Sequence, residues 1–269
     1  MTTPWETTGT LVRRRRAENP GPMTLDGTNS YILSAPGAPG VVVVDPGPLL
    51  EGHLAELAAA GAVELILITH RHGDHTDGSA RLHELTGAPV RAFLQEFCHA
   101  AAPLHDGELI QAGGLTIEVL ATPGHTSDSL CFAVTGPDGG EQLVFTGDTI
   151  LGSGSTVLDY PDGTLADYLD SLARLRQRGI DHGSAASQVK VLPGHGPVLP
   201  DLAAAAEGYQ AHRAERIAQV RAAVEHLRVD GAGFPTAEAV TAVVYGDVPA
   251  NLQGAAQLSV QAQLDYLRG

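Results

Sequence analysis

Apolar and polar positions along the chain follow periods that predict a mixed α/β structure. Short runs rich in β-branched and aromatic residues, bounded by glycine or proline, predict strands at residues 30–33, 41–44, 64–69, 115–121, 130–134, 142–146 and 189–192. Longer stretches with apolar residues near helical spacing predict helices at residues 49–60, 78–86 and 165–178. Strands and helices therefore alternate over the first three quarters of the chain.

The pattern changes after Pro200, where strand signals stop and a helical stretch runs over residues 202–227. A glycine-rich break at residues 231–235 follows. Thr236 is placed to cap the next helix, and a final helix ends near Leu267. The sequence leaves two roles open for this helical tail, which either covers the core or contacts a substrate.

Histidine and aspartate gather where predicted strands end. The run T-H-R-H-G-D-H at residues 69–75 follows one apolar strand, and His125, Asp148 and His195 each follow another, with a glycine beside them. Imidazole nitrogens and carboxylate oxygens are ligands that Zn²⁺ accepts, and a tight turn can direct several of them to one point. One such loop could be a solvated polar turn, but four of them predict a metal site.

These motifs, in this order, resemble the metallo-β-lactamase superfamily over about residues 29–197, and H-x-H-x-D-H is their most specific part. The resemblance implies an α/β fold, an αββα four-layer sandwich with a dinuclear metal site at one edge. It also implies a catalytic domain over residues 1–200 and a C-terminal α-helical, winged-helix-like domain over residues 201–269.

The same resemblance assigns the metal ligands. One zinc is expected on His70, His72 and His125, the other on Asp74, His75 and His195, with Asp148 bridging the two. The expected cofactor is two Zn²⁺ per chain, with Mn²⁺ or Fe²⁺ as alternatives, and the expected nucleophile is a metal-bridging hydroxide. Asp74 would orient this hydroxide and receive its proton, so Asp74 and Asp148 are the predicted catalytic residues.

Two further aspartates stand in the motifs. Asp45 resembles the family's aspartate that orients a ligating imidazole, and the alternative is an ordinary turn residue. Asp77 stands where many members carry glycine, and we expect it to cap the next helix.

The substrate class is less sharply indicated. Asp148 occupies the position where β-lactam hydrolases of this fold typically carry cysteine, which disfavours antibiotic hydrolysis. Residues 19–31 and 152–175 are similar to the branch of lactamase-beta-like endoribonucleases, which implies a hydrolase that cleaves single-stranded RNA. The alternative is an acyl thioester or small ester or lactone hydrolase, since related sequences include acyl-carrier thioesterases. A mononuclear iron dioxygenase ranks below both.

Charge and composition narrow these expectations. The chain has 31 acidic and 16 basic residues, a formal net charge of -15, so its overall field repels polyanions. Residues 13–16 and four arginines of the tail could contact phosphate locally, and the alternative is a solvated face, the tail positions being Arg213, Arg216, Arg221 and Arg228. A narrow site pocket lined by Tyr160 and Leu151, remote from the arginines, would favour the thioester.

Cellular location and partners follow from simple features. Two cysteines cannot form a disulfide framework, and no apolar run approaches the ~20 residues that span a bilayer. We therefore expect a cytoplasmic protein that acts on a small molecule or on single-stranded RNA, with no membrane association and no obligate protein partner.

Overall fold

The computed structural model describes residues 4–136, 140–184, 187–228 and 234–268. Its first sheet has strands in the order β1-β2-β3-β4-β5-β6, antiparallel from β1 to β4 and parallel from β4 to β6. The bounds are Glu6–Thr7 (β1), Val12–Arg16 (β2), Asn29–Leu33 (β3), Val41–Val44 (β4), Val63–Leu67 (β5) and Val90–Arg91 (β6).

The second sheet has the order β11-β10-β9-β8-β7, and only its β10–β11 pair is parallel. Its strands are Leu109–Ala112 (β7), Leu115–Ala121 (β8), Leu130–Thr135 (β9), Gln142–Gly147 (β10) and Lys190–Pro193 (β11). The two sheets face each other across an apolar layer, in which the ring of Tyr31 meets that of Phe145 edge to face, with centroids 5.2 Å apart.

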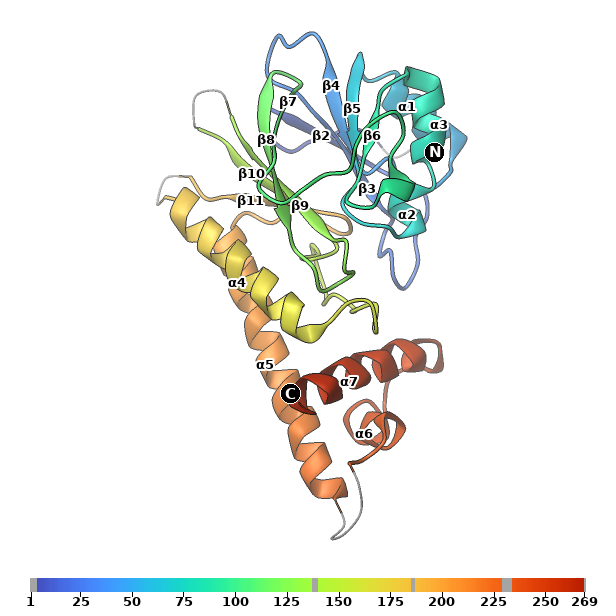
Figure 1. Ribbon diagram of the computed structural model, residues 1–269, viewed down its shortest axis with the longest axis vertical. Coiled ribbons are helices and arrows are strands. Elements are labelled where there is room, and N and C mark those ends of the chain that lie inside the picture. Colours follow the sequence, from blue (N-terminus) through green and yellow to red (C-terminus); the bar gives the residue numbers. More distant parts are fainter. Residues whose placement is uncertain (1–3, 137–139, 185–186, 229–233, 269) are drawn as a thin grey trace.

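Helices cover both outer faces of this pair of sheets (Figure 1). On the first sheet lie α1 (Glu51–Ala58) and α3 (Ser79–Thr86), and between them in the chain is the short α2 (Gly73–Thr76). On the second sheet lie α4 (Leu165–His182) and the first part of α5 (Leu202–Leu227). The layers are thus helix, sheet, sheet, helix, which confirms the expected αββα sandwich. The 3₁₀ turns are η1 (Gln95–Phe97) and η2 (Ala250–Leu252).

The C-terminal helices form a cluster of their own. The end of α5 packs against α6 (Ala237–Val244) and α7 (Gln253–Arg268) through buried side chains that include Val224, Val240 and Leu264. Thr236 caps α6 by accepting a hydrogen bond from the Ala239 N–H, as predicted. All described elements beyond Pro193 are helical, which confirms the helical tail, and they include no strand that would form a wing.

The structure does not test two of the sequence predictions, the glycine-rich break and the division into domains. Residues 231–233 of the expected break lie outside the described residues. The division into domains at residue 200 stays a prediction.

Residues 13–16 have a role that the sequence interpretation missed. They belong to β2, an interior strand of the first sheet, and Arg14 and Arg15 are only 9% and 4% exposed. Arg14 pairs with Glu6, and Arg15 pairs with Glu56 at 2.5 Å. The expectation of a phosphate-contacting or solvated arginine cluster is therefore wrong for these two positions. A strand of arginines carries no apolar signal, so its burial rests on partners distant in the sequence.

Among the described residues, no helix combines the length and the apolar composition that crossing a membrane requires.

Candidate metal centre

The seven predicted ligands come together where strands of both sheets end. β5 stops at Leu67, and the chain then turns through His70 and His72 into α2, which carries Asp74 and His75. The remaining three follow β8, β10 and β11, and they are His125, Asp148 and His195. The last loop approaches so closely that a Cβ on Gly194 would lie 2.4 Å from Asp148 Oδ1, which explains the glycine there.

Three imidazoles form the first half of the site. His72 Nδ1 lies 3.1 Å from His70 Nε2 and 3.1 Å from His125 Nε2. Zinc–nitrogen bonds of about 2.0–2.1 Å in a tetrahedral site place ligand nitrogens about 3.3 Å apart. The three nitrogens therefore have the spacing that one divalent ion requires.

The second half combines two imidazoles with a carboxylate. Asp74 Oδ2 lies 3.1 Å from His195 Nε2 and 3.3 Å from His75 Nε2, and these two nitrogens are 3.3 Å apart. Asp148 stands between the halves, because its Oδ1 is 3.5 Å from His75 Nε2 and its Oδ2 is 3.8 Å from His125 Nε2. This is the place that a bridging ligand would occupy.

The hydrogen bonds around the cluster fix which nitrogen of each ring faces inward. The outer nitrogens of three rings meet groups that can only accept: His72 Nε2 meets Asp159 at 3.3 Å, His125 Nδ1 meets the Val157 carbonyl at 2.6 Å and His195 Nδ1 meets the Gly27 carbonyl at 3.3 Å. In a neutral ring, a proton on the outer nitrogen leaves a lone pair on the inner one. The inner nitrogens are therefore ready to bind a cation.

Asp45 orients the other two rings. Its Oδ2 accepts a hydrogen bond from His75 Nδ1 at 2.8 Å and one from Thr69 Oγ1 at 2.7 Å, while Oδ1 accepts from the Thr69 N–H at 2.8 Å. The Thr69 hydroxyl in turn accepts from His70 Nδ1 at 3.1 Å. Asp45 is buried, with a left-handed φ of 51°, so it is the imidazole-orienting residue and more than a turn aspartate.

Asp77 does not cap the next helix. The residue before α3 is Gly78, which makes no side-chain cap, and Asp77 instead closes the end of α2. The prediction that Asp77 caps the next helix is wrong because residues 73–76 form a separate short helix, α2, and Asp77 is its C-cap residue.

The two halves differ in the electrostatics of their imidazoles. Burial, reinforced by neighbouring histidines, lowers the pKa values of His70 and His125. Burial opposes protonation of the other half too, but the carboxylates outweigh it: they raise the pKa of His75 well above its ordinary value, and Asp148 foremost raises the pKa of His195 to about 9. The electrostatic environment of the second half therefore favours a positive charge, either as protons on His75 and His195 or as a bound cation.

The carboxylates of Asp74 and Asp148 are ionised, which also favours a bound cation. Burial acts to raise the pKa values of Asp74 and Asp148, yet the surrounding histidines hold both below the ordinary range, so both are ionised at neutral pH. Asp148 Oδ1 is buried and has no hydrogen-bond partner among the described residues. An orphaned carboxylate oxygen surrounded by inward-facing imidazole nitrogens fits bound divalent metal.

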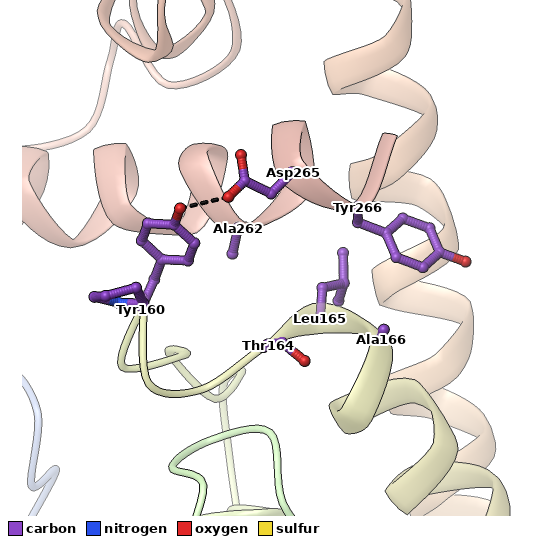
Figure 2. Close-up of a pocket in the computed structure, with 8 residues that line it drawn as sticks. Tyr160, Thr164, Leu165, Ala166, Ala262, Asp265 and Tyr266 are labelled. Atoms are coloured by element: carbon purple, nitrogen blue, oxygen red, sulfur yellow. Dashed lines mark hydrogen bonds between the residues drawn. The ribbon is translucent and has the colours of Figure 1, made fainter. Parts of the chain in front are cut away.

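The supports of the first half come from a segment that lies outside the predicted ligand motifs. Val157 and Asp159 belong to residues 153–163, between β10 and α4. The same segment reaches the C-terminal helices, because the Tyr160 hydroxyl donates a hydrogen bond to Asp265 of α7 (Figure 2). The His125–Val157 contact joins residues 32 positions apart, and the Tyr160–Asp265 contact joins residues 105 positions apart. A local sequence pattern therefore could not predict either contact.

Two of the four arginines predicted in the tail, Arg213 and Arg216, are not on an exposed face. Arg213 is 4% exposed, donates a hydrogen bond to the Thr156 carbonyl and lies over the ring of Tyr168 at 4.9 Å. Arg216 is half-buried, 5.6 Å from the ring centre of Tyr245. The expectation of a phosphate-contacting or solvated arginine is therefore wrong at position 213, whereas Arg221 and Arg228 are exposed.

The narrow pocket lined by both Tyr160 and Leu151, which would favour the thioester, is not present among the cavities described. Tyr160 lines a cavity against α7, shown in Figure 2, whereas Leu151 lines a different one against α5. Arg213 and Arg216 line a third cavity, described below, so they are not remote from the segment that supports His125.

Known proteins resemble this chain over most of its length. An atrochrysone carboxyl ACP thioesterase of Aspergillus chevalieri is 32% identical, over 88% of this chain and 74% of its own. The beta-lactamase-like protein 2 homolog of Caenorhabditis elegans is 30% identical, over 98% of this chain and 86% of its own.

A solved structure shares the fold across both the sandwich and the helices. The Beta-lactamase domain protein from Burkholderia ambifaria is 20% identical, with a TM-score of 0.77 over 98% of this chain and 87% of that chain. The family model of the metallo-beta-lactamase superfamily matches residues 23–195, which contain all the clustered histidines and aspartates. With this fold and this cluster, the chain belongs to the metallo-beta-lactamase superfamily and is a metal-binding hydrolase.

Proposed function

We propose that this chain is a dinuclear zinc hydrolase that acts on an acyl thioester or a related small ester. The observation that carries the proposal is the convergence of seven ionised or lone-pair-bearing side chains on one buried point. Five imidazoles and two carboxylates exceed what a single tetrahedral ion binds, which supports two ions.

The ligand sets follow from the distances given above. One ion would be held by His70, His72 and His125, the other by Asp74, His75 and His195, with Asp148 shared between them. When bound, the metal pair supplies Lewis acidity, which lowers the pKa of water towards neutrality and polarises the substrate carbonyl.

Asp74 is the residue that we assign to orienting the attacking water. Its side chain is 26% exposed, against 11% for Asp148, so it can reach a reacting group. The Thr28 hydroxyl donates a hydrogen bond of 3.0 Å to Asp74 Oδ2 and fixes the carboxylate. The lowered pKa of Asp74 keeps its carboxylate ionised at neutral pH, so it can accept a hydrogen bond from the attacking water and orient it.

A thioester or ester now ranks above single-stranded RNA. Arg14, Arg15 and Arg213 are buried, so neither of the two arginine groups predicted to contact phosphate is exposed as a whole. Aromatic residues make up only 4% of the sequence, which leaves few stacking platforms for bases. The 32% identity with a protein named as a thioesterase supports the same order.

Zinc-loaded protein tests the proposal against three substrates in parallel: an acyl-CoA thioester, a chromogenic phosphodiester and a single-stranded RNA. We expect thioester hydrolysis that is lost on chelation and restored by zinc. Cleavage of the RNA with no thioester turnover would reverse the ranking of substrates.

The metal itself is tested by elemental analysis of protein purified from its own source. We expect two zinc ions per chain. One iron per chain would replace the zinc hydrolase with the iron dioxygenase alternative.

A further inference from the structure

A cavity of about 290 Å³ lies beside the metal centre, between the N-terminal loop, the segment 153–163 and the C-terminal helices. We call it the helix-side cavity, and its walls include Met23, Val157, Arg213, Arg216, Tyr245 and Leu252. Its volume is at the lower end of the range of about 300–1,000 Å³ for ligand pockets, so it suits part of a substrate.

Two of its lining residues hold predicted ligands directly. The Val157 carbonyl accepts a hydrogen bond from His125 Nδ1 at 2.6 Å, and Thr156 Oγ1 donates one of 2.8 Å to the Asp148 carbonyl. The cavity wall and the metal site are therefore the two sides of one short segment. A molecule in the cavity is thus separated from the predicted ligands His125 and Asp148 by this one stretch of chain.

The charges that line the cavity have one sign. Arg213, Arg216 and the titratable His212 line it, and its lining includes no aspartate or glutamate. Neither arginine forms an ion pair with a carboxylate among the described residues, although the sequence has 31 acidic residues. This concentration of positive charge contrasts with the net charge of the chain.

Arg213 is the sharpest of these observations. It is 4% exposed, and its Nε is buried with no hydrogen-bond partner among the described residues. Buried arginines are almost always paired, because removing a guanidinium from water without a counter-charge is costly. Arg216 has five donors, of which the hydrogen bonds described use one, to Gln219 Oε1 at 2.7 Å.

The rest of the wall is mainly apolar. Met23, Val157, Val248 and Leu252 line it, and Met23 is 52% exposed although it is a large apolar side chain. A site with apolar walls and a few convergent charged donors binds a molecule that has both characters.

We propose that the helix-side cavity binds the non-reacting part of the substrate, an apolar group bearing one carboxylate or phosphate, which Arg213 and Arg216 recognise. This inference rests on the proposed function, because it places the substrate's reacting carbonyl at the metal centre. It adds the specificity determinants, which the metal ligands do not supply.

The test is calorimetric titration of zinc-loaded protein with octanoate, octyl phosphate and octanol. We expect both anions to bind at least tenfold more tightly than octanol, and the tighter of the two identifies the anionic group. Arg216→Gln should weaken anion binding roughly tenfold and leave octanol within twofold, and Arg216→Lys should restore part of the loss. Arg221→Gln, an equal charge change on the exposed face of the same helix, is the matched control.

The outcomes separate this inference from the proposed function. Unchanged anion binding in Arg216→Gln, or an equal loss in Arg221→Gln, overturns the cavity's role, because coordination of the anion by zinc alone would be indifferent to Arg216. Charge-selective binding without hydrolysis of any thioester keeps the cavity's role and rejects the substrate class. A melting temperature within a few degrees of the unmodified chain verifies that each variant is folded.

Discussion

The two halves of the metal centre are supported by different parts of the chain. The half formed by Asp74, His75 and His195 rests on buried groups near the sheets, chiefly Asp45 after β4 and the Gly27 carbonyl before β3. The half formed by three histidines rests on Val157 and Asp159, in a segment that also reaches α7, and Asp45 touches it only through the Thr69 hydroxyl, which contacts His70.

The supports also differ in charge and exposure. The Asp45 side chain is 3% exposed and accepts three hydrogen bonds, whereas the Asp159 side chain is 38% exposed and shares its charge with Arg71. A carboxylate in a buried site acts on its neighbours far more strongly than one screened by water. We infer that the half next to Asp45 holds its metal more tightly, and that the half next to Asp159 is the more readily emptied.

The largest expected effect comes from removing the residue that both halves share. Asp148→Ala deletes the carboxylate between them, so the metal content should fall from two ions to one or fewer, and hydrolysis should fall by about 10²–10³-fold or more. Elemental analysis and initial rates measure this. Asp170→Ala, at an exposed position of α4, is the matched control and should change neither. Unchanged metal content in Asp148→Ala would contradict the bridging role.

Asp45→Asn should weaken the half that we infer to be the tighter one. Asparagine tolerates the left-handed backbone at position 45, so the change mainly removes charge and turns an acceptor into a donor facing His75 or Thr69. Metal affinity at this half should fall by about 10–100-fold. Two-site zinc titration measures it. Equal weakening of both halves would show that Asp45 acts as strongly through Thr69 on His70 as it does on His75, and would contradict the stronger hold of the second half.

Asp159→Asn is the matching change in the other half. Because Asp159 is partly exposed and its contact with His72 is 3.3 Å long, the loss of metal affinity should be about tenfold or less. The same titration should show the weaker site affected and the tighter site unchanged. A loss larger than that of Asp45→Asn would invert the comparison of the two halves.

Acid should destabilise the side of the molecule that carries Asp45. His53 of α1 is buried against Ser30 of β3, and burial, aided by the charge of Arg15, lowers the pKa of His53 to about 4. Since this is below the ordinary 6.5, the unfolded chain takes up a proton first, and the stability present above about pH 6.5 is lost as pH falls towards 4.

The expected loss from His53 between pH 6.5 and 5.5 is about 1 kcal/mol. Urea unfolding at both pH values measures it in the unmodified chain and in His53→Gln, which should show a smaller acid loss by that amount. Identical acid losses in the two proteins would mean that His53 does not titrate as its burial requires.

The same contrast explains what the sequence could predict. A metal site was predictable because four loops with histidine or aspartate each follow a strand, while the individual ligands and the role of Asp45 came from the resemblance to the superfamily. Val157 and Asp159 could not be predicted, since a backbone carbonyl has no residue signature and Asp159 lies outside the four ligand motifs. β2 was missed for the opposite reason, because Arg14 and Arg15 look like surface residues until Glu6 and Glu56 are brought to them.

The segment 153–163 lies between the residues that would bind metal and the residues that would select the substrate. Its inner side holds His125 and Asp148, while the far wall of the helix-side cavity comes from α5, the loop that carries Tyr245 and Val248, η2 and α7. A mutant library confined to that far wall, at positions such as Val248, Leu252 and Ala255, leaves every metal ligand and its hydrogen-bond partners intact. The reactive centre can thus be kept constant while the size and charge of the accepted molecule are varied.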